Sequence, residues 1–231
     1  MLKNDALLLL TMALDDVVKT DTRHQILKDA DYGDLFKGSK RKRFWKQIGA
    51  DYLSVIMWVP PHELMHAGVN KLLGGENKEI VFNKFFGGDL WASIIPGAQA
   101  KWMIPIIGGY VRPENPSDFA FATMALAPYA MTPLGIYMVL KGKKKENIPL
   151  TAAGSGLLAI HYGGIIGDWL NIGRLTLYDS VQSVAQLFDG DISSYKTGLL
   201  AIFGGFLVGR YFMKKSYDVS RKAITSIADV A

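Results

Sequence analysis

The sequence predicts an all-α polytopic membrane protein with about four transmembrane helices and a small membrane-associated β-hairpin or re-entrant insert. Hydrophobic residues make up 49% of the 231 residues and the mean hydropathy is +0.14, which is unusual for a soluble globular protein. The apolar residues gather in runs of about 20, the length that an α-helix needs to cross a bilayer. Basic residues gather beside these runs, as they do in membrane proteins.

The first predicted element is an amphipathic segment over residues 1–48. It contains 17 charged side chains, and apolar residues recur at helical spacing between Leu7 and Val18. This pattern predicts one or two helices in the cytoplasm or at the membrane interface.

The predicted membrane-embedded core covers residues 49–213. Its apolar runs predict spans at about 51–74, 118–140, 148–173 and 197–213. Residues 79–112 differ, because the stretches EIVFNKFF and LWASII are β-prone, Gly87-Gly88 separates them, and prolines interrupt the remainder. This composition predicts a hairpin or re-entrant insert directly after the first span.

The distribution of charge predicts the orientation of the chain. Lysine and arginine are concentrated in residues 37–46, in residues 141–145 and in a basic tail at 214–231. Because cytoplasmic loops carry most basic residues, we expect a multi-pass integral membrane protein with both termini in the cytoplasm. The basic clusters flank apolar runs without interleaved aromatic residues, so the expected partner is the lipid bilayer and not nucleic acid.

The most specific motif is H-E-L-M-H at residues 62–66, in the first predicted span. Residues four apart share one face of a helix, so His62 and His66 can bind one metal ion with Glu63 beside it. Pro60-Pro61 directly before the motif predict that the helix begins or kinks there. The chain has no cysteine, which leaves His, Asp and Glu as metal ligands. The alternative is that the two histidines only hydrogen-bond to neighbouring helices.

A third ligand is needed, because a hydrolytic zinc site uses three protein ligands and keeps one position for water. Asp168 and His161, in the third predicted span, are the candidates. Counted from the outer charged ends of their helices, His66 and Asp168 both lie about 8 to 9 Å deep. His161 lies about 20 Å deep, some 6 Å deeper than His62. We therefore expect Asp168 to be the third ligand.

Other roles are open for these polar side chains. His161 lies seven residues before Asp168 on the same helix face, so it is the alternative ligand or a group that orients one. Asn70 is a candidate for the same two roles. The competing interpretation of Asp168 is a buried ion pair with Arg174 or Lys101.

This arrangement resembles a known family. The H-E-L-M-H helix, the insert after it, the ALAP sequence at Ala125 to Pro128 and a parallel helix with Gly167-Asp168 are similar to the three-helix core of site-2-protease-like intramembrane zinc metalloproteases. The closest likeness is to their zincin peptidase branch, over about residues 50–190. The resemblance implies that His62, His66 and Asp168 bind Zn²⁺ and that Glu63 is the catalytic base.

The same residues predict a chemistry. A divalent ion held by two imidazoles and a carboxylate lowers the pKa of bound water toward about 7, and Glu63 can take the proton. We therefore expect an intramembrane zinc metalloprotease that cleaves a transmembrane protein substrate, which the edge of the hairpin could hold by strand pairing. The alternatives are a non-proteolytic metal-binding membrane protein, with a regulatory, transport or pseudoenzyme role, and a scaffold that binds no metal.

Overall fold

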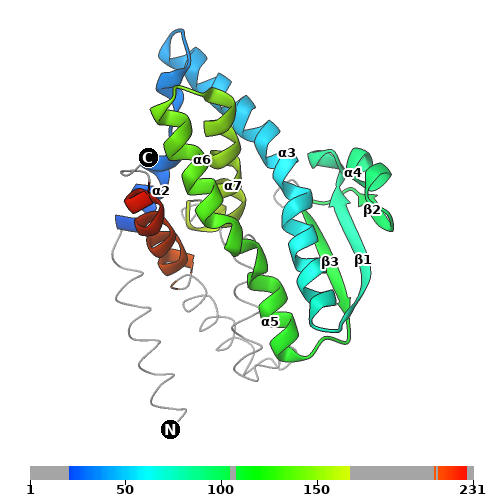
Figure 1. Cartoon of the computed structure of the whole chain (residues 1–231). Helices are drawn as coiled ribbons and strands as arrows, with labels where there is room; N and C mark the ends of the chain where they lie inside the picture. Colours follow the sequence, from blue (N-terminus) through cyan, green and yellow to red (C-terminus); the bar gives the residue numbers. More distant parts are fainter. Residues whose placement is uncertain (1–20, 105–107, 167–210, 212, 228–231) are drawn as a thin grey trace, which may run out of the picture.

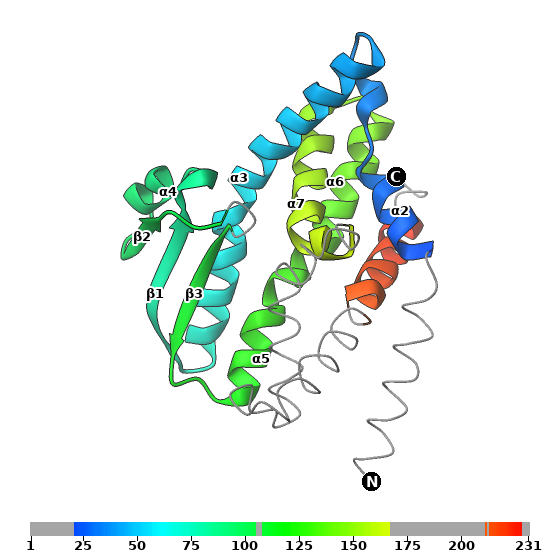
Figure 2. The ribbon, with the colours of Figure 1, turned by 180° about the vertical axis from the view of Figure 1, so that it is seen from behind.

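The computed structural model describes residues 21–104, 108–166, 211 and 213–227. Figures 1 and 2 show a long diagonal helix, α3, that runs between a small sheet on one side and the helix pair α6 and α7 on the other. The elements are α2 (Asp21–Ala30), η1 (Gly33–Leu35), α3 (Lys40–Leu72), β1 (Glu76–Asn83), η2 (Lys84–Phe86), α4 (Gly88–Ile94), β2 (Ala98–Lys101), β3 (Gly109–Glu114), α5 (Asp118–Leu126), η3 (Ala127–Met131), α6 (Thr132–Lys144), α7 (Ile148–Ile166) and a C-terminal helix over residues 213–227.

Helix α3 is 33 residues long and carries the H-E-L-M-H motif near its C-terminal end. The helix does not begin at Pro60-Pro61, which lie inside it. Each proline lacks the N–H that would bond to the carbonyl four residues earlier, so the carbonyls of Ile56 and Met57 lose their helical donors. Helix α3 ends at Leu72, just before Gly74-Gly75, and Gly74 adopts a φ of 82°, which glycine reaches without strain.

The insert after α3 is a three-stranded sheet in the order β2-β1-β3, with β1 parallel to β2 and antiparallel to β3. The predicted hairpin is wrong, because the stretch LWASII forms most of α4. Gly87 is left-handed, and a Cβ atom at Gly88 would lie 2.7 Å from the carbonyl oxygen of Phe82. The two glycines thus turn the chain tightly against β1, and β1 pairs with segments farther along.

The prediction of an all-α protein with about four transmembrane helices is also wrong. Within the described residues, one helical segment, Phe119–Lys144, is long and apolar enough to cross a membrane. Helix α3 begins with a basic stretch, and α7 is apolar because it packs inside the protein, where Leu157, Leu158 and Tyr162 are fully buried. Almost all of the predicted span at 197–213 lies outside the described residues.

Two hydrophobic clusters form the described core. One joins α2, α6, α7 and the C-terminal helix, and the other joins α3 to the sheet. Helix α7 contributes to both, because Tyr162 belongs to the first cluster and Ile160 packs against the second. The buried residues are Ile26, Ile136, Val139, Leu158, Tyr162, Met213 and Tyr217 in the first cluster and Val59, Phe82 and Phe86 in the second.

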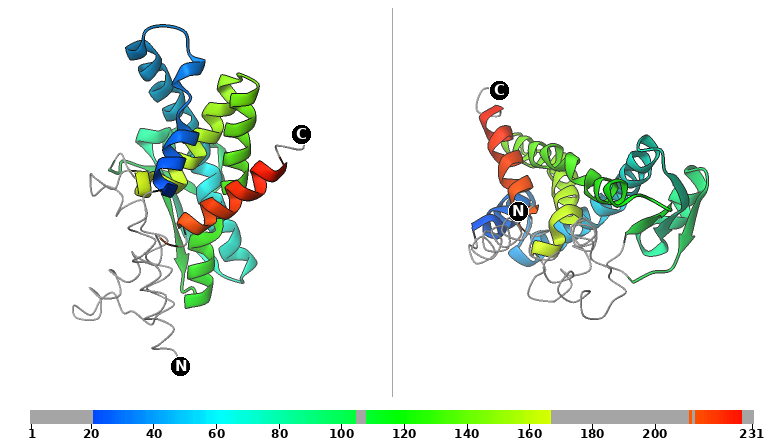
Figure 3. Two further views of the ribbon diagram at one scale, coloured as in Figure 1. Left: turned by 90° about the vertical axis from the view of Figure 1, so that its left-hand side faces the viewer. Right: turned by 90° about the horizontal axis from the view of Figure 1, so that it is seen from below.

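Buried polar contacts fix α2 to its neighbours. Asp29 of α2 accepts hydrogen bonds from the Tyr217 hydroxyl at 2.5 Å and from Arg221 Nε at 2.7 Å, where the C-terminal helix lies against α2 (Figure 3). The Tyr32 hydroxyl donates to Asp51 of α3 at 2.8 Å. Burial raises the pKa of the Asp51 carboxyl above its usual range. The first two bonds join α2 to the C-terminal helix, and the third joins the segment after α2 to α3.

Candidate metal centre

His62 and His66 face one another on successive turns of α3. Their Nε2 atoms are 3.2 Å apart, and their ring centroids are 4.9 Å apart. Two imidazole nitrogens bound to one tetrahedral zinc ion at 2.0–2.1 Å would be about 3.3 Å apart. The two histidines therefore already have the spacing of two ligands of one ion.

The backbone of α5 orients the ring of His66. Its Nδ1 lies 2.8 Å from the carbonyl oxygen of Met124. A carbonyl can only accept, so Nδ1 carries the proton and the lone pair of Nε2 points at His62. Pro128 leaves room for this bond, because it has no N–H to donate to the Met124 carbonyl four residues earlier. The backbone N–H of Ala127, three residues after Met124, donates to the Met124 carbonyl instead, in a 3₁₀ turn.

Glu63 is buried, with 6% of its surface exposed, between α3 and the start of β3. A Cβ atom at Gly109 would lie 2.9 Å from Cγ and 3.1 Å from Cδ of Glu63. One at Gly108 would lie 2.7 Å from Cγ2 of Val59, one helical turn before Glu63. This glycine pair lets the backbone of β3 approach α3 closely and so fixes where the carboxyl group of Glu63 can lie.

A third histidine, His161 of α7, lies beside the pair. It is 0% exposed, and its ring centroid is 5.5 Å from that of His62 and 5.4 Å from that of Tyr129. Burial, with smaller contributions from His62 and His66, holds the pKa of His161 well below its usual range, so the ring is neutral. Its Nδ1 lies 3.3 Å from Oγ1 of Thr132, and its buried Nε2 has no hydrogen-bond partner among the described residues.

These donors fit a metal ion in part. Two imidazoles on one tetrahedral ion have ring centroids about 5.2 Å apart. The ring centroid of His62 lies 4.9 Å from that of His66 and 5.5 Å from that of His161. In the part of the chain that the structure describes, however, no group of three His, Cys, Asp or Glu side chains is arranged to hold an ion. The spacing of His62 and His66 fits two ligands of one ion and supplies no third. Asp168 lies outside the described residues, so its role stays a prediction.

Asn70 and Lys101 make other contacts. Nδ2 of Asn70 donates to the carbonyl of Glu76 at 2.9 Å and to Oδ1 of Asn77 at 2.7 Å, which ties the end of α3 to the start of β1. Lys101, considered above as a partner of Asp168, donates to Glu79 at 2.9 Å across the sheet. The side-chain amide of Asn70 is thus directed at the turn after α3.

Several residues at this site were not expected from the sequence. Two of them carry a local signal: Pro128 inside an apolar helix exposes the Met124 carbonyl, and the pair ending in Gly109 marks a close backbone approach. Thr132 and Tyr129 carry no such signal, because only the packing of α6 against α7 brings them to His161.

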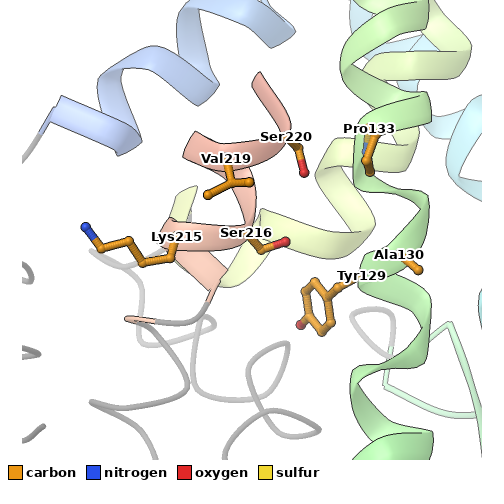
Figure 4. A pocket seen from close by; sticks show the side chains of 7 residues that line it. All are labelled: Tyr129, Ala130, Pro133, Lys215, Ser216, Val219 and Ser220. Atoms are coloured by element: carbon orange, nitrogen blue, oxygen red, sulfur yellow. The ribbon is translucent and has the colours of Figure 1, made fainter. Parts of the chain in front are cut away.

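An open pocket of about 480 Å³ lies next to this cluster, between η3, α6 and the C-terminal helix (Figure 4). Tyr129 belongs to its wall and also contacts the ring of His161, so it lies between the pocket and the histidines. The lining residues are Tyr129, Ala130, Pro133, Lys215, Ser216, Val219 and Ser220.

Comparison of the chain with models of protein families, with curated proteins and with solved structures finds no match.

Proposed function

We propose that the protein is a zinc-dependent peptidase that cleaves a membrane-spanning protein substrate, with His62 and His66 as metal ligands and Glu63 as general base. The observation that carries the proposal is the 3.2 Å separation of the two Nε2 atoms. The bond from His66 to the Met124 carbonyl adds to it, because it leaves the lone pair of His66 Nε2 facing His62. The resemblance of the motif to site-2-protease-like enzymes supports the same chemistry.

The reaction is hydrolysis of a peptide bond. A zinc ion at this site would polarise the substrate carbonyl and lower the pKa of water. Glu63 accepts a proton from the attacking water as the C–O bond forms, and donates it to the leaving amine as the C–N bond breaks. The close approach of Gly109 restricts where the carboxyl group of Glu63 can lie, which supports a fixed position for the general base.

The surroundings of the site support a substrate in the membrane. The segment Phe119–Lys144 is apolar enough to cross a bilayer, and it supplies the Met124 carbonyl that holds His66. We propose that this segment places the protein in a membrane. Among the described strands β3 is at the edge of the sheet, and its first residue, Gly109, touches Glu63. An extended substrate that pairs with β3 would therefore pass the general base.

The test is metal analysis combined with cleavage of single-span substrates by the purified full chain. His66→Ala is expected to lose zinc, whereas Glu63→Gln is expected to keep zinc and lose cleavage. His24→Ala is the matched control, since His24 is exposed on α2, and should keep both. Parallel zinc analysis of Asp168→Ala and His161→Ala identifies the third ligand.

Two results would overturn the proposal. Retained activity in Glu63→Gln would favour the non-proteolytic metal-binding protein, because hydrolysis needs the carboxylate as base. Wild-type protein without stoichiometric zinc would favour a scaffold in which the histidines only bond to one another.

A further inference from the structure

The first turns of α3 extend past the neighbouring helices. Gly156 of α7 lies against Ser54 of α3, because a Cβ atom at Gly156 would overlap the Ser54 side chain. Helix α7 begins eight residues before Gly156, at Ile148, whereas α3 begins 14 residues before Ser54, at Lys40. Helix α3 therefore reaches about 9 Å beyond the start of α7. Figures 1 and 2 show this projection above the turn between α6 and α7.

The projecting turns expose large apolar side chains. Phe44, Trp45 and Ile48 have 57%, 59% and 42% of their surfaces exposed. The same turns are attached to the protein, since Nε2 of Gln47 donates to the carbonyl of Ala30 at 3.2 Å. The apolar side chains are thus exposed on a helix that is held in place, and not because the helix is detached from the fold.

Basic side chains lie one helical turn before these apolar residues, on the same face. Lys40 precedes Phe44 by four residues, and Arg41 precedes Trp45 by four. Residues 37–46 contain six basic and no acidic side chains. The face therefore changes from basic to aromatic along the first turns of α3.

These charges do not stabilise α3 itself. Its first turn has no acidic residue, and the helix dipole is positive at this end, so basic side chains are unfavourable there. Among the described residues, one of the six, Arg43, forms an ion pair, with Asp34 at 2.6 Å. A bilayer with anionic lipids supplies partners for both kinds of side chain: phosphate groups for Lys and Arg, and an interface for aromatic rings.

The face also lies where the apolar segment Phe119–Lys144 ends. A Cβ atom at Gly142, in the last turn of α6, would overlap Thr151, near the start of α7. The end of α6 is thus level with the start of α7, and the first turns of α3 project beyond that level. A bilayer around the proposed membrane segment would have its surface there, beside the first turns of α3.

We propose that the face formed by Lys40, Arg41, Phe44, Trp45 and Ile48 docks on the surface of the bilayer and selects anionic lipid headgroups. The inference rests on the membrane placement in the proposed function and is independent of the zinc site. The basic side chains contact the phosphate groups, and the aromatic rings lie at the boundary between headgroups and acyl chains.

The experiment uses the full chain, which has no cysteine, with a fluorescent label on Ile48→Cys. The protein is reconstituted into phosphatidylcholine vesicles with a small fraction of brominated phosphatidylglycerol or brominated phosphatidylcholine, whose bromine atoms quench nearby fluorophores. We expect the anionic quencher to be at least about fivefold more effective, the effect of one basic side chain at an anionic surface. A label on Leu134→Cys, at a position 45% exposed within the apolar segment, should be quenched by both lipids to a similar extent.

Charge variants test the headgroup contact. Lys40→Gln combined with Arg41→Gln should bring the two quenchers within about twofold of each other. Lys71→Gln combined with Lys78→Gln is the matched control, because it removes two exposed basic side chains near the other end of α3, and it should keep the preference. Trp45→Ala should weaken quenching by both lipids and keep their ratio, because it removes apolar contact but no charge.

Equal quenching by the two lipids at residue 48, with all charges in place, would overturn the inference. So would a preference that survives Lys40→Gln with Arg41→Gln. Quenching at residue 134 but not at residue 48 would refute the docking face alone, whereas its absence at both positions would refute the membrane placement as well. A label at residue 48 that responds to polyglutamate or single-stranded DNA, but to neither lipid, would assign the face to a soluble acidic partner instead.

Discussion

Gly109→Ala tests whether the contact between β3 and α3 positions the general base. The new Cβ atom would lie 2.9 Å from Cγ and 3.1 Å from Cδ of Glu63, and 2.7 Å from the carbonyl oxygen of Val81. Carbon atoms in ordinary contact are about 3.5–4.0 Å apart, so the carboxyl group must move by about 0.5 to 1 Å. A displacement of about 1 Å in a reacting group can cost about 100-fold in rate.

We therefore expect peptide cleavage by Gly109→Ala to fall about 10- to 100-fold while zinc remains bound. The crowding should also lower the free energy of unfolding by about 1–3 kcal/mol, measured by denaturant titration. Zinc should remain because the spacing of His62 and His66 is set within α3 and by the Met124 carbonyl.

Two glycine controls separate these effects. Gly108→Ala would crowd the side chain of Val59 at 2.7 Å, so it should lose stability and keep most of the cleavage. Gly68→Ala has no atom within 4 Å of the new Cβ, so cleavage should stay close to wild type, and stability should rise by about 0.5–1 kcal/mol because alanine favours the helix. Wild-type cleavage in Gly109→Ala, with zinc bound, would refute the argument that this contact positions Glu63.

Three other substitutions test separate parts of the structure. Pro128→Ala introduces an N–H that competes with His66 for the Met124 carbonyl, so zinc affinity in chelator competition should fall about 10-fold. Gly154→Ala places a Cβ 2.6 Å from a carbonyl oxygen of α6, and thermal unfolding should show a loss of about 1–3 kcal/mol. Asp51→Asn should raise the free energy of unfolding at pH 7, because burial raises the pKa of Asp51 and disfavours its charged form in the folded protein. Denaturant titrations should show this gain disappear as the pH falls below the ordinary pKa of 3.8, where the wild-type carboxyl is protonated in both states.

Hydrophobic pattern located the helices but not their environment. The predicted spans at 51–74, 118–140 and 148–173 each overlap a helical segment that the structure describes. An apolar run has the same composition whether it contacts lipid or protein, and α7 is apolar because it packs between α3 and α6. The helical conformation of LWASII was not predictable either, because short apolar runs rich in aromatic and β-branched residues do not distinguish strand from helix.

The position of His161 shows what counting depth from the charged ends of two helices leaves out. That count placed Lys71 and Arg174 at the same depth in the membrane. It therefore paired each residue of the first helix with the residue 103 positions later in the third, and this difference in residue number is the offset between the two helices. In the structure the contacts between α3 and α7 span offsets from 95 residues, for Trp58 and the carbonyl of Ala153, to 102 residues, for Ser54 and Gly156. The ring contact between His62 and His161 lies between these values, at 99 residues. Side chains that reach along the helices therefore bring His161 to His62 in spite of the depth difference of about 6 Å that the count gave. A charged residue marks where a helix meets water, whereas contacts within the helix pair set which side chains meet. For a metal site, which needs ligands within a few ångströms of one another, the interhelical contacts decide.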